Sequence, residues 1–279
     1  MLSSLLLLAF SSLPQDPGEQ ESEVEITTEE VSPEEAAAQL KEVLGGKDYA
    51  AQAAILEVAG IIPGKVVVKE VAKAMKSKDL GVQLAAISAL RYNTDPYSLT
   101  VLLKEKKNKK IVDVDELAEE YFYALGQHGN TKAIDTLSKG VWSTAKNTKI
   151  IRARILSLGH IRDIDACEAL MNLMKSTGGR RSRSMGGRST EFRMAMCVLT
   201  GTDTGGNSTD WISWWNDSKK SLKISEDEYP LWSKNLQRQW DLLWATPEER
   251  EEARRKQREK RDGGKGGKGD NDELTEDDI

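Results

Sequence analysis

Cysteine and histidine, the residues that most metal centres require, are scarce in this sequence. Two of each occur among 279 residues. Neither Cys167 nor Cys197 has a second Cys or His at metal-ligand spacing. Both lie in helical patterns, so we expect buried free thiols. A disulfide between neighbouring helices stays open if the protein is exported, because sequence separation alone cannot decide it.

Recognisable catalytic and cofactor motifs are also missing. The chain has no Ser-centred nucleophile elbow, His-Glu-x-x-His helix or dinucleotide fingerprint. Residues 201–208 loosely resemble a phosphate loop, but Asn207 stands where the lysine belongs. His128 and His160 follow equivalent positions of the repeats described below. Repeat register explains their likeness better than a shared metal site, which would need a third ligand. We therefore expect a protein that is not an enzyme, with no catalytic residues, cofactor or metal.

Aromatic residues make up only 6% of the chain, and Phe occurs three times. Strand-forming residues are sparse, whereas Ala, Leu, Lys and Glu dominate the middle of the sequence, as is typical of helices. This composition predicts an all-α fold. Six of the seven tryptophans lie between residues 211 and 244, which indicates a local structural role and not a general core preference.

Positive charge is missing from both ends of the chain, which has a net charge of −5. Residues 15–31 contain no Lys or Arg, and the last ten residues are strongly acidic. We expect an acidic disordered linker over residues 15–31, and a Gly/Lys linker with an acidic disordered tail over residues 263–279. An overall basic footprint for nucleic acid is absent.

Long apolar runs are absent except at the start, where residues 5–10 are apolar but too few to span a bilayer. An acidic, Pro-containing stretch follows at once. This pattern predicts a signal peptide over residues 1–14 and export to the periplasm or cell envelope, with no membrane span in the mature chain. The alternatives are a surface-docked N-terminal turn or a misplaced start codon, with a cytoplasmic protein.

The central stretch contains an internal repeat. Five short segments align at intervals of roughly 31 to 41 residues, the range of helical repeat arrays. Apolar residues recur three positions before each anchor and twelve positions after the first four. The anchors are Ala59, Leu90, Leu125, Leu158 and Leu199.

Each repeat unit has the pattern of a helical hairpin, because apolar residues recur three and four positions apart. The Gly or polar pair after each anchor is expected to close one helix before the next begins. Ser32-Pro33-Glu34-Glu35 is a strong helix start for a first, degenerate unit. We therefore expect a right-handed superhelical solenoid of about five stacked helix pairs over residues 32–201.

The turns and following helices of residues 34–201 resemble HEAT repeats, including the shorter phycobilisome-lyase type. Leu199-Thr200-Gly201, followed by Gly205 and by Trp211-x-x-Trp214-Trp215, is similar to the ending of many HEAT-repeat proteins of planctomycete-like bacteria. The resemblance implies a binding scaffold and supplies no catalytic residues.

Trp211, Trp214 and Trp215 share a helical face, and we expect them to form a structural cap on the last repeat, within a capping segment over residues 202–246. The alternative is an aromatic cage or sugar-stacking platform. Downstream, a stripe at helical spacing is expected to lie against the cap or the last repeat. Its members are Trp232, Leu236, Trp240 and Leu243.

A charged helix without an apolar face is expected over residues 247–262, starting at Thr246-Pro247 and supported by pairs such as Glu251 with Arg255. A loop inserted in the last repeat carries four candidate anion- or partner-binding residues: Arg180, Arg181, Arg183 and Arg188. This loop either grips phosphate or carboxylates or is simply solvated.

Two functions remain open at this stage. The first is a non-enzymatic scaffold that binds an unknown protein partner through the surface of the solenoid. The second is a binder of an anionic polymer, nucleic acid or acidic glycan, through the loop at residues 180–188 and the charged helix.

Overall fold

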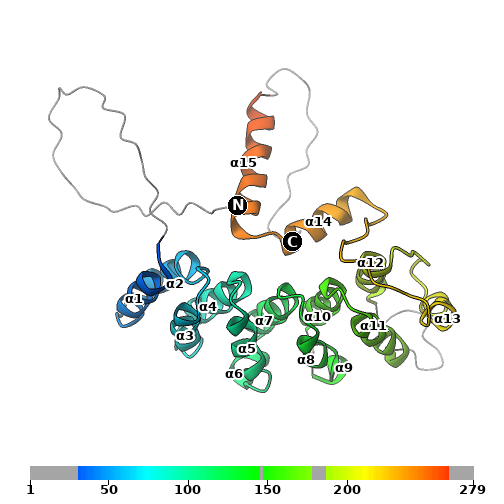
Figure 1. Cartoon of the computed structure of the whole chain (residues 1–279), viewed down its shortest axis with the longest axis horizontal. Helices are drawn as coiled ribbons and strands as arrows, with labels where there is room; N and C mark the ends of the chain where they lie inside the picture. Colours follow the sequence, from blue (N-terminus) through cyan, green and yellow to red (C-terminus); the bar gives the residue numbers. More distant parts are fainter. Residues whose placement is uncertain (1–30, 145–146, 178–186, 264–279) are drawn as a thin grey trace. The chain divides into compact units, whose positions relative to one another are not determined.

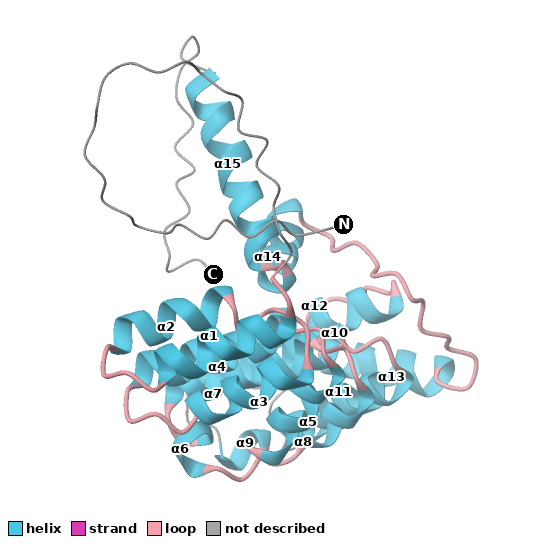
Figure 2. Ribbon diagram, turned by 60° about the vertical axis from the view of Figure 1, so that its left-hand side comes forward, coloured by secondary structure: helices cyan, strands magenta, loops and turns pink. Residues whose placement is uncertain are grey.

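Helices are the regular secondary structure of this protein, as the composition predicts (Figure 2). The structure is a computed structural model that describes residues 31–144, 147–177 and 187–263, and no strand occurs among them. None of the helices in these ranges combines the length and the apolar character needed to cross a membrane. The expected signal peptide, most of the acidic linker and nearly all of the C-terminal tail lie outside the described residues.

The chain divides into two compact units, residues 1–98 and 99–279. The boundary falls inside helix α5 (Pro96–Lys104), a position that the sequence does not single out. In the first unit, α1 packs against α2 and α3, and α4 packs against α2 and α3. These helices are α1 (Pro33–Leu44), α2 (Tyr49–Val58), α3 (Lys65–Ala74) and α4 (Leu80–Tyr92).

Helix starts follow the local sequence closely. Ser32 and Glu35 form the predicted capping box at α1, with the Ser32 hydroxyl accepting from the Glu35 amide and the Glu35 carboxylate accepting from the Ser32 amide. The Asp48 carboxylate caps α2 by accepting from the amides of Ala50 and Ala51, and the Asp79 carboxylate caps α4 by accepting from the amide of Val82. Each cap satisfies backbone donors that a helix leaves without partners.

The second unit contains the remaining helices. Helices α7, α10 and α12 pack one after another, as do α8, α11 and α13, and α10 joins the two series through α8 and α11 (Figure 1). The bounds are α6 (Lys109–Val112), α7 (Asp115–Gln127), a 3₁₀ turn (Thr131–Ala133), α8 (Ile134–Ser138), α9 (Val141–Thr144), α10 (Thr148–His160), α11 (Ile164–Thr177), α12 (Ser189–Thr200), α13 (Ser208–Ser218), α14 (Lys234–Trp244) and α15 (Pro247–Gly263).

The repeated positions of the sequence are core positions. All five anchors are buried, at or near the C-terminal ends of α2, α4, α7, α10 and α12. The residues three positions before them are buried as well, and so are those twelve positions after the first four. Because burial of apolar surface is the main stabilising term, these shared positions explain why the same spacing recurs along the chain.

The Gly or polar pairs after the anchors lie at helix ends, as expected: α7 ends at Gln127 and α10 at His160, one residue after Gly126 and Gly159. These two glycines also allow the next helix to come close. A Cβ atom on Gly126 would stand 2.5 Å from Ser157, and one on Gly159 would stand 2.6 Å from the Cβ of Ala195. Such contacts would force the helices apart.

Candidate functional site

The arginine loop is largely outside the described residues. Arg180, Arg181 and Arg183 fall there, and only Arg188 can be placed. Its Nη1 atom lies 2.9 Å from Oε1 of Glu191 in the first turn of α12. The charge of Arg188 is therefore neutralised locally, and this residue is not presented as an open anion site.

The tryptophan motif lies on α13, which packs against α11. Trp211 is fully buried and Trp215 is 5% exposed, whereas Trp214 is partly exposed. The rings of Trp211 and Trp214 meet edge to face, with centroids 5.7 Å apart. The burial of Trp211 and Trp215 is what a covering role requires, but the cap itself stays a prediction.

The residues before this helix explain the spacing of the motif. Gly201 ends α12 in the left-handed conformation, with φ of 68°, and a Cβ there would meet the ring of Tyr229 at 2.8 Å. The Asp203 carboxylate accepts from the Gly205 amide and pairs with Arg193. The Gly205 carbonyl then accepts from Nε1 of Trp211 at 2.8 Å. The loop thus positions the buried indole.

The expected tryptophan stripe is wrong in one respect. Trp232 precedes α14, is 40% exposed, and lies under the guanidinium of Arg193 of α12, whose Cζ is 3.7 Å from the ring centroid. Trp240 and Trp244 contact α10 through His160, and Trp244 contacts α7 through Tyr123.

Five residues form a clasp that binds α14 and the preceding segment to α10, which we call the Glu228 clasp: His160, Arg162, Glu228, Trp240 and Trp244. The Glu228 carboxylate lies 3.0 Å from Nδ1 of His160 and accepts from Nε1 of Trp240 at 2.7 Å. The imidazole stacks on Trp244, with centroids 4.0 Å apart. Arg162 donates to the carbonyls of Val198, Ser225 and Asp227.

The electrostatics of the clasp depend on Glu228. Partial burial by itself would raise the pKa of the Glu228 carboxyl, but the hydrogen bonds from His160 and Trp240 and the charge of Arg162 outweigh it, so the pKa lies below its usual value of 4.5. The folded state therefore binds the proton less readily than the unfolded state. The resulting stabilisation is present above pH 4.5 and is lost as the pH falls through the lowered pKa.

We expect Glu228→Gln to remove this pH dependence. At neutral pH the variant loses charge-assisted hydrogen bonds and unfolds at a lower temperature than the wild type. As the pH falls below 4.5 and through the lowered pKa, the two proteins converge, because protonation then costs the wild type the same interactions. Thermal unfolding from neutral pH to pH 3 measures the difference, and a constant gap between the curves contradicts the assignment. Glu226→Gln, an exposed neighbour, is the control.

Both cysteines are free and buried, as expected for core thiols, and they do not form a disulfide. The thiol of Cys167 lies 3.8 Å from the sulfur of Met196. Burial raises the pKa of each thiol to about 12, so neither is a reactive thiolate at neutral pH.

The two histidines have separate surroundings. His128 is the C-terminal cap residue of α7, and His160 belongs to the Glu228 clasp. Within the ranges that the structure describes, no group of three or more His, Cys, Asp or Glu side chains is placed to hold a metal ion.

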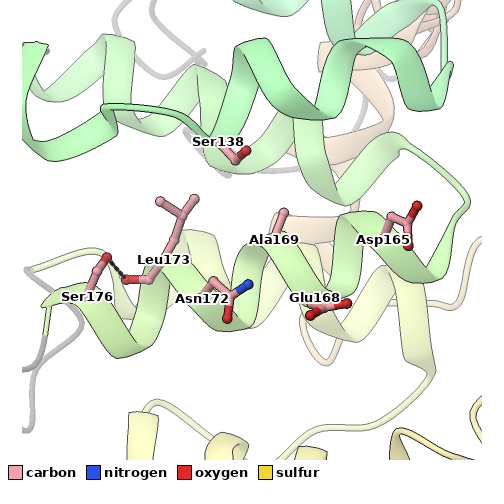
Figure 3. A pocket seen from close by; sticks show the side chains of 7 residues that line it. All are labelled: Ser138, Asp165, Glu168, Ala169, Asn172, Leu173 and Ser176. Atoms are coloured by element: carbon pink, nitrogen blue, oxygen red, sulfur yellow. Dashed lines mark hydrogen bonds between the residues drawn. The ribbon is translucent and has the colours of Figure 1, made fainter.

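A groove lies between α8 and α11 in the second unit (Figure 3). Its volume is about 410 Å³. One wall is Ser138 of α8, and the other side is a strip along α11. The α11 residues are Asp165, Glu168, Ala169, Asn172, Leu173 and Ser176.

The strip on α11 has a buried floor and an exposed polar edge. Ala169 and Leu173 are buried, whereas Asp165, Glu168 and Asn172 are exposed. At 1.5 Å per residue, the strip from residue 165 to 176 is roughly 17 Å long, which matches about five residues of extended chain. The groove therefore has the size and the mixed lining of a site for a peptide segment.

The far end of the groove is fixed by a hydrogen-bond chain. Ser176 donates to the carbonyl of Leu173 at 2.7 Å and accepts from Nε1 of Trp142 at 2.9 Å. Because Trp142 belongs to α9, this chain ties the end of α11 to the segment that follows α8.

Neither the groove nor the Glu228 clasp is apparent in the sequence. The clasp joins residues far apart in the chain, and its only sequence signal is the pair of histidines at equivalent repeat positions. The groove residues recur three and four positions apart, so they read as the ordinary exposed edge of an amphipathic helix. No protein-family model matches the chain, and no curated protein matches it either.

Proposed function

We propose that this protein is a non-enzymatic scaffold that binds a protein partner through the groove between α8 and α11. The proposal includes the repeat architecture: HEAT-like helix pairs, about five in number, stacked into a right-handed solenoid that continues past Leu199 to the tryptophan cap. Repeat proteins of this kind bind extended segments on surfaces formed by neighbouring units.

The observation that carries the proposal is the form of the groove. It is open along the exposed side of α11, whereas sites for small ligands enclose most of the ligand surface. Its buried floor offers apolar contact, and Asn172 and Ser138 at its sides offer hydrogen bonds to a peptide backbone. A bound segment of another chain needs both the apolar contact and the backbone hydrogen bonds.

The alternative, a binder of nucleic acid or acidic glycan, has less support. Arg188 is paired with Glu191. The charged helix α15 carries its cations beside acids, with Lys256 paired to Glu252 and Arg255 near Glu259. A surface of mixed sign lacks the concentration of positive charge that phosphate binding requires.

The proposed location is the periplasm or cell envelope, because the apolar run at residues 5–10 followed by an acidic stretch is typical of an exported chain. In that setting the partner is an envelope or periplasmic protein. The protein then acts by binding alone, without a cofactor.

We expect a photo-crosslinking amino acid at Asn172 to capture a defined partner in intact cells. Asn172 is exposed and lines the groove, so a reactive group there reaches any bound segment without disturbing the core. The adduct is identified by mass spectrometry of the crosslinked peptide. Its formation should be lost when a second change, Ser138→Trp, fills the opposite wall.

The matched control is the same amino acid at Lys175, which is exposed on α11 but does not line the groove. Adducts of equal yield from both positions would reflect random collision and contradict the proposal. The absence of any adduct at Asn172 would do the same.

A further inference from the structure

We propose that the occupant of this groove is an extended segment that places a lysine or arginine side chain against Asp165 and Glu168. The inference rests on the proposed scaffold function and names the chemistry of the partner. The expected ligand is a cationic peptide segment, and not an apolar or acidic one.

The charges lining the groove all have one sign. Asp165 and Glu168 are exposed on its edge, and no Lys or Arg is among the residues that line it. Neither carboxylate is paired with a basic side chain anywhere in the described residues. The lining therefore contributes only negative charge, and a positively charged segment is its complementary ligand.

Glu168 lies three residues after Asp165, so the two carboxylates share one face of α11. The helix dipole favours Asp165 in the first turn, and its effect fades before Glu168 is reached. The two like charges on this face repel each other.

The lysines next to the lining residues in the sequence do not themselves line the groove. Lys139, which follows α8, forms an ion pair with Asp135 at 2.5 Å. Lys175 of α11 is exposed and lies outside the lining. A cationic side chain of the partner would therefore meet two carboxylates, and no Lys or Arg among the lining residues would compete with it for them.

The floor of the groove suits the rest of such a side chain. Lysine and arginine carry a stem of methylene groups below the charged head, and such stems pack on apolar surface while the head remains in water. Ala169 and Leu173 supply that apolar surface beside the two acids. A short acidic or purely polar side chain would leave this floor uncovered.

The test uses the full chain and three synthetic Gly/Ser peptides that differ at their central positions, which carry Lys, Ser or Glu. We expect the Lys peptide to bind most tightly by fluorescence anisotropy. Asp165→Asn combined with Glu168→Gln should weaken it about three- to tenfold, the range for two partly solvated ion pairs. Added salt should weaken wild-type binding and affect the double variant less.

The matched control is Asp210→Asn combined with Asp217→Asn, which removes two exposed acids from α13, one of them also in the first turn. Equal weakening by both double variants would place the Lys peptide elsewhere on the acidic chain and overturn the inference. Loss of binding in Asn172→Trp, but not in Lys175→Trp, supports the groove.

The remaining outcomes separate the two proposals. If the Ser peptide binds as tightly as the Lys peptide and is displaced by Asn172→Trp, the groove binds peptides but the cationic inference is wrong. If none of the peptides binds and the crosslinker at Asn172 captures nothing, both proposals are wrong. Circular dichroism of each variant checks that these exposed substitutions leave the fold intact.

Discussion

Replacing Trp211 with alanine is expected to lower the free energy of unfolding by about 3 to 5 kcal/mol, the usual scale for a large aromatic removed from a core. The indole is fully buried, and its Nε1 atom donates to the carbonyl of Gly205. The variant leaves a cavity and an unpaired carbonyl at the same place. A loss of this size is a large fraction of the stability of a typical domain.

The loss should begin near the C-terminal helices. Trp211 lies on α13, which packs against α11, and α11 packs against α12. In stacked helical units, stability is a sum of units and interfaces, so damage spreads from the affected end. Hydrogen exchange should show the amides of residues 192–200 losing protection before those of residues 55–60.

Trp214→Ala is the matched control, because Trp214 is in the same helix but is partly exposed. We expect it to cost roughly 1 kcal/mol, since less apolar surface is returned to water. Equal losses in the two variants would contradict the assigned burial. An unchanged melting curve for Trp211→Ala, with strong quenching of tryptophan fluorescence, would favour an exposed aromatic platform over a cap.

The sequence predicts those parts of the fold that depend on neighbouring residues. Ser32 and Glu35 form their capping box within a single turn, and Thr246 with Glu249 does the same at the start of α15. The anchor positions are predictable for a related reason. A buried helix face needs an apolar residue every three or four positions, whatever the helix packs against.

Contacts between distant segments are where prediction fails. Gly126 is expected only to help end a helix, because nothing nearby in the sequence reveals that Ser157 will also lie against it. Trp232 fits a helical stripe by spacing, but the helix begins only at Lys234, and the indole packs under Arg193 instead. The spacing of residues carries no information about which helix will be the neighbour.

The candidate site shows the same limit. The sequence directs attention to the arginine loop, since a cluster of like charges is conspicuous in a linear reading. Asp165 and Glu168 are equally visible, but they gain meaning only when α8 lies beside α11 and leaves a groove between them. The site follows from helix packing, which cannot be recognised from residue spacing in a single sequence.

Arg154→Met is the other substitution with a large expected effect, about 3 to 5 kcal/mol of unfolding free energy. Arg154 of α10 is buried, and its guanidinium donates to the carbonyls of Thr136, Leu137 and Lys139 at the end of α8. These carbonyls have no partner within their own short helix. Burial lowers the pKa of Arg154 to about 10, so the group remains charged at neutral pH.

The guanidinium also lies over the ring of Phe122, with Cζ 4.7 Å from the ring centroid. Methionine keeps an apolar side chain there but removes both the hydrogen bonds and this cation–π contact. Arg154→Lys should be intermediate, because a single ammonium cannot match the planar fork of the guanidinium. Arg152→Met, a less buried arginine of the same helix, should change stability by no more than about 0.5 kcal/mol. Urea unfolding measures all three variants. If Arg154→Met proves as mild as Arg152→Met, the guanidinium does not stabilise the end of α8.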